Sequence, residues 1–346
     1  MLGDSSHFLG RGVGTAVRAH GADFLFIHVR DLLLRADLFF FNLESPVSSS
    51  DGVDYQTKLY RAPANACPSL KLGAVNIASL ANNHILAHGP SLLQETRRHL
   101  ENAGIAGAGF SPDGRDDLRT ARLMVGGFTV SIHCESLIKD CTGEVIDYSK
   151  IEDRIVRSFS TMPADVRIVS LHWGDEFVPV PAPYQQQLAH RLVERGANLI
   201  LGHHPHVLQP VEEYKGALIA YSLGNFVFDQ RWGPEVETGA ILDVILSPTI
   251  QEWTLHHTKT NHDYQPELFA GIKSGFQASS DGLSQVGPGL TDTQYLSLRS
   301  TYSRRFRLRM KCELLQHFWN VSMDTWLCLL SNRWRAIRGQ LRLSDE

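Results

Sequence analysis

Four polar clusters, each directly after a short apolar run, constrain the fold of this chain more than any other feature. The clusters are Asn42-Leu43-Glu44, Asn82-Asn83-His84, His172-Trp173-Gly174-Asp175-Glu176 and Gly202-His203-His204-Pro205-His206. A buried strand that ends at such a cluster carries polar side chains to the edge of a sheet, which is where open α/β sheets bind ligands. The four clusters therefore predict one shared cleft, and their histidines predict that it holds metal.

Between and before these clusters, the apolar pattern alternates between strand and helix. Short runs rich in Val, Ile, Leu and Phe predict buried strands at residues 37–41, 75–80, 128–132, 166–171, 199–201, 218–223 and 241–246. Helices are predicted at residues 91–102 and 184–195, because each follows a proline and is closed by a glycine. This order favours a layered α/β core over residues 1–250.

Composition narrows the class of protein. A chain of 346 residues with 43% hydrophobic content can form one large domain with an appendage, or about two domains. Its net charge of −4 gives no reason to expect nucleic-acid binding. The five cysteines are scattered without CxxC spacing, which favours a reducing compartment over a disulfide framework. Without a signal peptide or a long uncharged apolar run, we expect a soluble, cytoplasmic protein.

The C-terminal third has a different character. Residues 251–294 are mostly polar and lack a clear period, so we expect an irregular connector there. Residues 295–346 carry apolar side chains at spacings of three and four among many arginines, which predicts a basic, amphipathic helical tail. Such a tail can pack on the core or on a second subunit. Its tryptophans and arginines also suit a membrane surface.

The residue types in the clusters are metal ligands. Three histidines in four positions, ending with His204 and His206, leave one strand end, and His172 leaves another unless it merely stacks on its tryptophan neighbour. Asn83 can add an amide oxygen, and His84 beside it can donate a proton to a leaving group.

Two carboxylates extend this set. Glu44 can hold two cations at once, because one carboxylate can lie between the ions of a two-metal site. Asp4 can supply a second carboxylate, although a role as a turn or helix cap is equally compatible with its position.

Taken in order, the motifs resemble one family. They are Gly3-Asp4 with Gly10-Arg11-Gly12, Asn42-Leu43-Glu44-Ser45-Pro46, Ala81-Asn82-Asn83-His84, His172-Trp173-Gly174-Asp175-Glu176, His204-Pro205-His206 and Ser222-Leu223-Gly224-Asn225-Phe226. This set, over about residues 3–246, resembles the capsule-synthesis CapA family of poly-γ-glutamate biosynthesis, which is similar to the calcineurin-like metallophosphoesterases. The resemblance implies a four-layer αββα sandwich of two facing mixed sheets, here with a C-terminal helical extension.

The resemblance also implies roles for the residues at the motif positions. Asp4 and His206 would bind a first divalent ion, Glu44 would bridge, and Asn83, His172 and His204 would bind a second, with Mn, Fe or Zn as the metals. His84 would be the general acid or an oxyanion stabiliser. The cleft and an anionic small-molecule or polymer substrate would be contacted by Arg11, Lys58, Tyr60, Arg61, Trp173, Glu176 and Asn225.

The chain departs from the family pattern in three places. Ser6 stands where related phosphoesterases have a histidine, which predicts a weaker first metal position, and Ala87 stands where an aspartate is common. Only Met1 and Leu2 precede Gly3-Asp4, so we expect the first strand to be very short or the start to be truncated.

Three functions fit the sequence. One is a metal-dependent hydrolase that acts on a phosphoester or an amide of an acidic substrate, in capsule or related biosynthesis. The second is a non-hydrolytic, polymer-handling component of poly-γ-glutamate synthesis or export, in which the tail docks on a partner. The third is a metal-stabilised binding module without turnover.

Overall fold

The computed structural model describes most of the chain. The described residues are 1–5, 11–50, 52, 59–110, 119–138, 147–269, 273–275, 289–316 and 323. The predicted substrate contact Lys58 and most of the predicted tail beyond residue 316 lie outside this set.

A six-stranded sheet forms the centre of the fold. Its strands, in spatial order, are β10 (Val211–Tyr214), β11 (Ala217–Ala220), β9 (Leu199–His203), β8 (Val166–His172), β7 (Phe128–Ser136) and β6 (Thr120–Val125). The four inner strands are parallel and the two edge strands are antiparallel to their neighbours. Most residues of the inner strands are buried, because both faces of the sheet are covered.

The second layer of strands has two parts. A parallel part consists of β1 (Leu38–Asn42), β4 (Val75–Ser79) and β5 (Ala106–Ala108). An antiparallel part consists of β12 (Thr238–Leu246), β13 (Ile250–Thr260), β14 (Pro266–Leu268) and β15 (Lys273–Gly275). The prediction of an irregular connector at 251–294 is therefore wrong at its start, because β13 pairs along the whole of β12.

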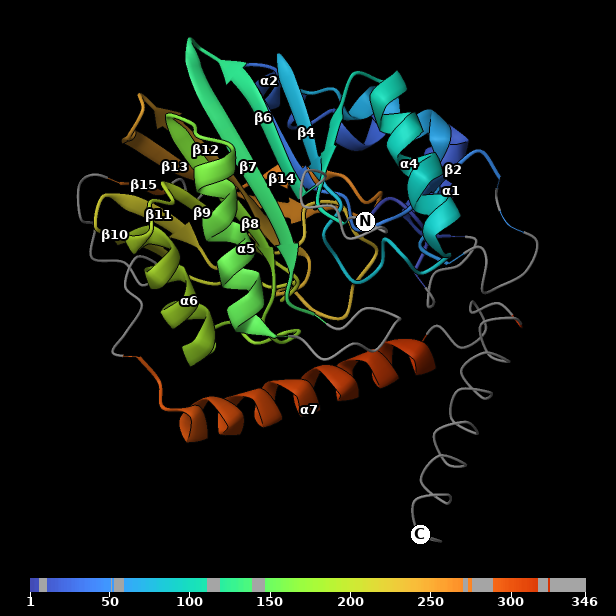
Figure 1. The fold of residues 1–346 in the computed structure, drawn as a ribbon. Coiled ribbons are helices and arrows are strands. Elements are labelled where there is room, and N and C mark those ends of the chain that lie inside the picture. The colour runs from blue at the N-terminus through green and yellow to red at the C-terminus, as the bar shows by residue number, and fades with distance from the viewer. Residues whose placement is uncertain are drawn as a thin grey trace, which may run out of the picture.

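Helices cover both outer faces, as Figure 1 shows. On the free face of the six-stranded sheet lie α5 (Tyr148–Thr161) and α6 (Pro183–Glu194). The parallel β1 part and the short pair β2 (Val47–Ser48) and β3 (Ala62–Pro63) are covered by α1 (Val13–His20), η1 (Ala22–Phe26), α2 (Arg30–Leu33), η2 (Ala64–Leu70) and α4 (Pro90–Asn102). Side chains of β4, β5, β12 and β13 pack against the six-stranded sheet in one core. The predicted α/β architecture of two packed sheets between helices is confirmed.

The two strand layers are not packed along their whole length. A cavity of about 790 Å³ lies between them, lined by β1, β12 and the facing strands of the six-stranded sheet. Among the described strands, β1 pairs only with β4. Residues 1–2 form no strand, and the amide of Leu2 donates to Ser45 Oγ (2.7 Å). One end of the cavity reaches Glu44, His204 and His206.

A 25-residue helix, α7 (Asp292–Gln316), confirms the first part of the predicted helical tail. It packs on the core through Tyr295 and Phe306, which are 5% and 2% exposed. In Figure 1 this helix runs across one end of the molecule, beyond α5 and α6. Within the described part of the chain, no helix combines the length and the apolar character that a membrane crossing requires.

Candidate metal centre

Glu44 lies at the centre of the histidine cluster. It follows β1 closely, and its side chain is buried. Its Oε1 atom lies 3.5 Å from His172 Nε2, 3.8 Å from His206 Nε2 and 3.9 Å from His84 Nε2. Among the described residues, the same oxygen finds no hydrogen-bond donor. One carboxylate oxygen therefore faces three imidazole nitrogens, although they come from three different parts of the sequence.

His172 and Asn83 form one side of this cluster. His172 is the last residue of β8, and strand pairing places it opposite His203 of β9. Its Nε2 atom lies 2.9 Å from Asn83 Oδ1, and its ring centroid lies 4.9 Å from that of His204. The strand ends thus bring together the three residues that the sequence assigned to one ion.

An unusual backbone aims the two remaining histidines. His204 and His206 have φ angles of +99° and +57°. Residues other than glycine rarely adopt positive φ angles. Such strained positions concentrate at functional sites. Asn225 Oδ1 lies 2.9 Å from His206 Nδ1, and the Asn225 amide donates to the Val236 carbonyl (2.9 Å). Asn225 therefore fixes the ring of His206 with Nε2 turned toward Glu44.

Two overlapping groups of side chains have metal-ligand spacing. The first is Glu44, His172 and His204, and the second is Glu176, His204 and His206; within each, the ligand atoms lie within 4.8 Å of one another. Because one ring nitrogen binds one ion, His204 can serve only one of them at a time. Glu44 Oε1, close to both His172 and His206, is the atom that can bind both ions.

The protonation states fit a divalent cation. Burial, reinforced by neighbouring histidines, lowers the pKa of His172 and of His204 well below the usual range, and burial also lowers the pKa of His206. These rings are therefore neutral at pH 7, which is the form that binds metals. His204 Nδ1 and Glu44 Oε1 are buried without a hydrogen-bond partner. Buried polar atoms rarely remain unpaired, so this donor set fits a metal ion.

His84 lies beside the ligands. Its ring centroid is 4.4 Å from that of Tyr60, and its backbone amide donates to Asn82 Oδ1 (3.2 Å). Burial lowers the pKa of His84, although the charge of Glu44 opposes that effect. His84 belongs to neither metal-spaced group among the described residues. It therefore stands next to the metal-spaced groups and outside them.

Asp4 belongs to neither metal-spaced group among the described residues. Its carboxylate accepts hydrogen bonds from the Thr15 amide (2.8 Å) and hydroxyl (2.6 Å) and pairs with Arg18 (3.1 Å). It therefore caps the first turn of α1, the second possibility that the sequence left open. Nearby, the amide of Ser5 donates to Asp229 (2.9 Å), and burial raises the pKa of Asp229 to about 7.

Replacing Asp4 with asparagine is expected to destabilise the protein and to leave its metal content unchanged. The variant loses a charge-assisted cap and an ion pair, which together contribute about 2 kcal/mol. Urea unfolding and elemental analysis of the same sample measure both quantities. Loss of metal in a folded Asp4→Asn protein would instead restore Asp4 as a ligand.

The structure gives the contacts of three other residues that were predicted to line the cleft. Trp173 is fully buried, stacks on Tyr221 and donates to the Tyr221 carbonyl (3.0 Å), so it belongs to the core beneath α6 and does not line the cleft. Asn225 lines the cavity between the strand layers, and its side chain contacts His206. Arg61 donates to the Ser50 carbonyl (3.2 Å).

The remaining predicted contacts divide into two groups. Tyr60 and Glu176 lie at the cluster, Tyr60 against His84 and Glu176 beside His204 and His206. Arg11 is exposed, and its carbonyl accepts from the Tyr264 hydroxyl (2.6 Å).

Two residues of the site were not singled out from the sequence. Asn82 donates to the Leu43 carbonyl (2.9 Å) and so ties the Glu44 loop to the His84 turn. Phe177 has its ring centroid 6.2 Å from that of His206. Asn82 stands within one of the sequence motifs, whereas no local signal distinguishes Phe177.

The metal-free protein is expected to lose stability as the pH falls from 6.5 toward 4. Burial lowers the pKa of His203 to about 4, so between these values the unfolded chain binds a proton that the folded chain does not. For this histidine alone, that difference lowers the free energy of unfolding by about 2 kcal/mol between pH 6.5 and pH 5. Chelator-treated wild-type and His203→Gln proteins, unfolded in urea at both pH values, should differ by this amount. An equal pH dependence in the two proteins would refute the assignment.

Comparison with known proteins gives matches to one family of bacterial proteins. Residues 1–230 match the family model described as bacterial capsule synthesis protein PGA_cap. The "Capsule biosynthesis protein CapA" of Bacillus anthracis is 32% identical over 250 residues, which cover 67% of this chain and 60% of that protein. The "PGA biosynthesis protein CapA" of Bacillus subtilis is 33% identical over 235 residues, which cover 65% and 62%. The chain thus spans about three fifths of the length of these relatives.

Among solved structures, a hypothetical protein from Thermus thermophilus aligns with a TM-score of 0.43 and 21% identity, over 74% of this chain and 93% of that one. A putative 5'-nucleotidase from Staphylococcus aureus aligns with a TM-score of 0.35 and 11% identity, over 66% and 42%.

Proposed function

The chain belongs to the bacterial capsule synthesis (PGA_cap) family, and from that premise we propose that it is a metal-dependent hydrolase of a phosphoester or an amide in an acidic substrate. Its setting would be poly-γ-glutamate, capsule or related biosynthesis. The substrate would be an anionic small molecule or polymer, and the protein would act in the cytoplasm.

One observation carries the proposal. Glu44 Oε1 is buried, accepts no hydrogen bond and lies within 4 Å of nitrogens from three imidazoles. In the absence of a cation, this arrangement costs free energy, because the buried carboxylate loses its hydration and, among the described residues, gains only a long hydrogen bond from Asn42 at Oε2 (3.4 Å). A folded chain tolerates such a cost at a site that binds a ligand.

The donor set suits two divalent ions. Asn83, His172 and His204 would hold one, His206 and Glu176 the other, and Glu44 would lie between them. Bound there, the ions would act as Lewis acids on a substrate oxygen and lower the pKa of water. His84 would hydrogen-bond to the leaving group or to a developing oxyanion, because it lies beside both positions and outside the ligand set.

Elemental analysis combined with two substrates tests the proposal. The protein, loaded with Mn or Zn, is expected to hold about two ions per chain and to hydrolyse either a generic phosphodiester or a γ-glutamyl polymer. Two bound ions with no turnover of either substrate would reject the hydrolase and leave a binding role. No bound metal would reject the metal centre itself.

The names of the relatives favour a second candidate. Those names refer to biosynthesis, and one from Mycobacterium tuberculosis reads "Probable polyglutamine synthesis accessory protein". A non-hydrolytic component that handles the polymer would retain the same cleft and would use the helical tail for a subunit or a membrane surface. Retention of a γ-glutamyl polymer on the metal-loaded protein without cleavage would support this candidate.

A further inference from the structure

We propose that α7 is a clamp on the loop 173–178, and that it holds this loop so that Glu176 reaches the second metal ion. The inference rests on the metal centre of the proposed function. It adds positioning residues from a helix that lies beyond residues 1–230, the part of the chain that matches the family.

The first hold is on the residue before Glu176. The Tyr295 hydroxyl donates to Asp175 Oδ2 (2.9 Å), and Arg299 Nε lies 3.0 Å from Asp175 Oδ1. Both carboxylate oxygens of Asp175 are therefore bound by α7. Tyr295 is itself fixed, because its ring is buried against Val178 and Ala182.

The second hold is on the residue after Glu176. Phe177 stacks on Phe306 of α7, with ring centroids 4.7 Å apart and an interplanar angle of 23°. Its φ angle is +66°, which is rare for a bulky residue and requires support from surrounding structure. The Phe177 amide donates to the Pro205 carbonyl (2.8 Å), between His204 and His206. Glu176 is thus flanked by two residues that α7 fixes, next to the histidines it would join.

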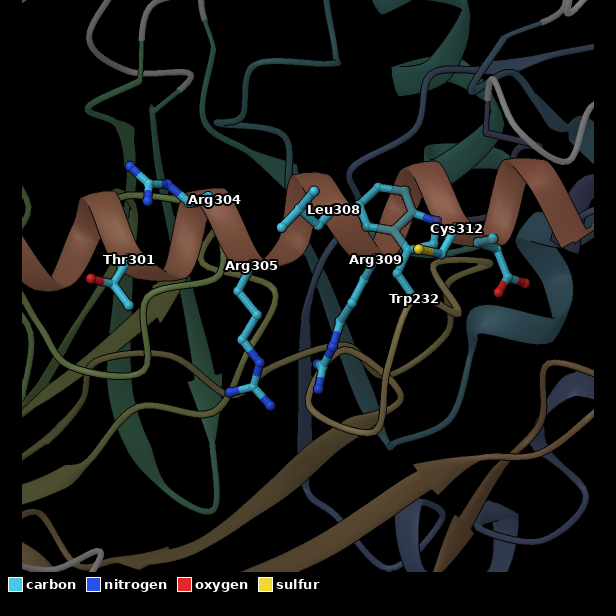
Figure 2. Close-up of a pocket in the computed structure, with 8 residues that line it drawn as sticks. Trp232, Thr301, Arg304, Arg305, Leu308, Arg309 and Cys312 are labelled. Atoms are coloured by element: carbon cyan, nitrogen blue, oxygen red, sulfur yellow. The ribbon is translucent and has the colours of Figure 1, made fainter.

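Two ion pairs with Glu235 hold α7 itself in place. Arg305 lies 3.0 Å from Glu235, and Arg309 pairs with the same carboxylate. Figure 2 shows Arg305 and Arg309 extending from α7 in the same direction, while Arg304 extends to the other side. Glu235 precedes Val236, whose carbonyl accepts from Asn225, and Asn225 in turn orients His206. The helix is therefore anchored close to both proposed ligands of the second ion, Glu176 and His206.

The alternative is that α7 only stabilises the fold. Positioning of Glu176 and general support of the fold differ in what they predict for the affinities of the two ions. If α7 positions Glu176, its loss lowers the affinity of the second ion. The first ion should bind independently of the clamp, because the polar contacts of Glu44, Asn83 and His172 join these residues to one another and to neighbouring histidines. Groups that orient metal ligands typically change metal affinity by about 10- to 100-fold.

The test measures Mn binding by titration calorimetry and by electron paramagnetic resonance, which separates spin-coupled ion pairs from single ions. In Phe306→Ala and Arg299→Ala, the affinity of the second ion is expected to fall about 10- to 100-fold, with the first within about threefold. The coupled signal should weaken accordingly. Arg304→Ala, on the same helix, is the matched control and should bind like wild type. Arg299→Lys, which keeps a cation near Asp175, should recover part of the loss.

Two outcomes would overturn the clamp. Unchanged affinities in both variants would show that Glu176 does not depend on α7. Equal losses at both ions, with a parallel fall in thermal stability, would show that α7 only supports the fold. Failure of the wild-type protein to bind any metal is a different result, because it removes the proposed metal centre and the clamp together.

Discussion

Replacing Glu44 with glutamine is expected to abolish binding of the ion pair and, at the same time, to stabilise the metal-free protein. Burial raises the pKa of Glu44, so the ionised carboxylate opposes folding at neutral pH when no cation is present. Removal of an unsatisfied buried charge is expected to add about 1–3 kcal/mol to the free energy of unfolding. The same change removes the carboxylate that would lie between the two ions, so turnover should fall to background.

The matched control is Glu135 on β7, the other buried glutamate among the described residues. It is 2% exposed, and it pairs with His133, Arg119 and Arg154. Burial alone would raise its pKa, but these partners outweigh that effect and lower the pKa to about 2. Glu135→Gln should therefore destabilise the protein by about 3–5 kcal/mol and leave metal content intact.

The two variants should thus move stability in opposite directions, as measured by urea unfolding of chelator-treated protein. Destabilisation of metal-free Glu44→Gln, or full metal content in that variant, would contradict the account of the site.

Replacing His84 with alanine is expected to lower kcat by about 10²- to 10⁴-fold while both ions remain bound. His84 lies 3.9 Å from Glu44 and belongs to neither metal-spaced group among the described residues, so its loss removes a hydrogen-bonding or proton-donating group and no ligand. Steady-state kinetics and elemental analysis of the same preparation give both quantities.

His99→Ala serves as the control, because His99 is a partly buried histidine on α4 that contacts Ser49 and Glu95. Loss of metal from His84→Ala would make His84 a ligand instead. Unchanged turnover in His84→Ala would show that His84 takes no part in cleavage. If no other variant affects cleavage either, the polymer-handling candidate would be favoured.

The ends of the strands were predictable from the sequence, and with them much of the site. Uninterrupted apolar runs give strands buried on both faces, and parallel strands place the residues after them at one edge. This is why Glu44, His172 and His204, distant in the sequence, lie together. The helices that begin near Pro90 and Pro183 were predictable for the same local reason, because proline suits the first turn.

The side to which each residue points was harder to predict. Side chains alternate between the faces of a strand, so Trp173 packs with Val169 and Leu171 beneath α6, whereas His172 points to the other face. The motif alone does not show which of these two residues faces the metal centre. Likewise, the role of Asp4 depends on α1 lying close to it in space, which local sequence does not determine.

The contribution of α7 was the least predictable part. Apolar spacing predicted the helix, but not the surface that receives its buried side chains. That surface is formed by Phe177 and Asp175, which follow β8 more than a hundred residues earlier. Strand β13 was missed because its sequence is largely polar, and its pairing with β12 determines its structure more than local propensity does.

The most direct measurement is an anomalous difference map from crystals of the Mn-loaded protein. We expect two peaks that share Glu44, one bound by Asn83, His172 and His204 and the other by His206 and Glu176. Peaks at Asp4 and Asp229, or no peak at the histidine cluster, would contradict this arrangement.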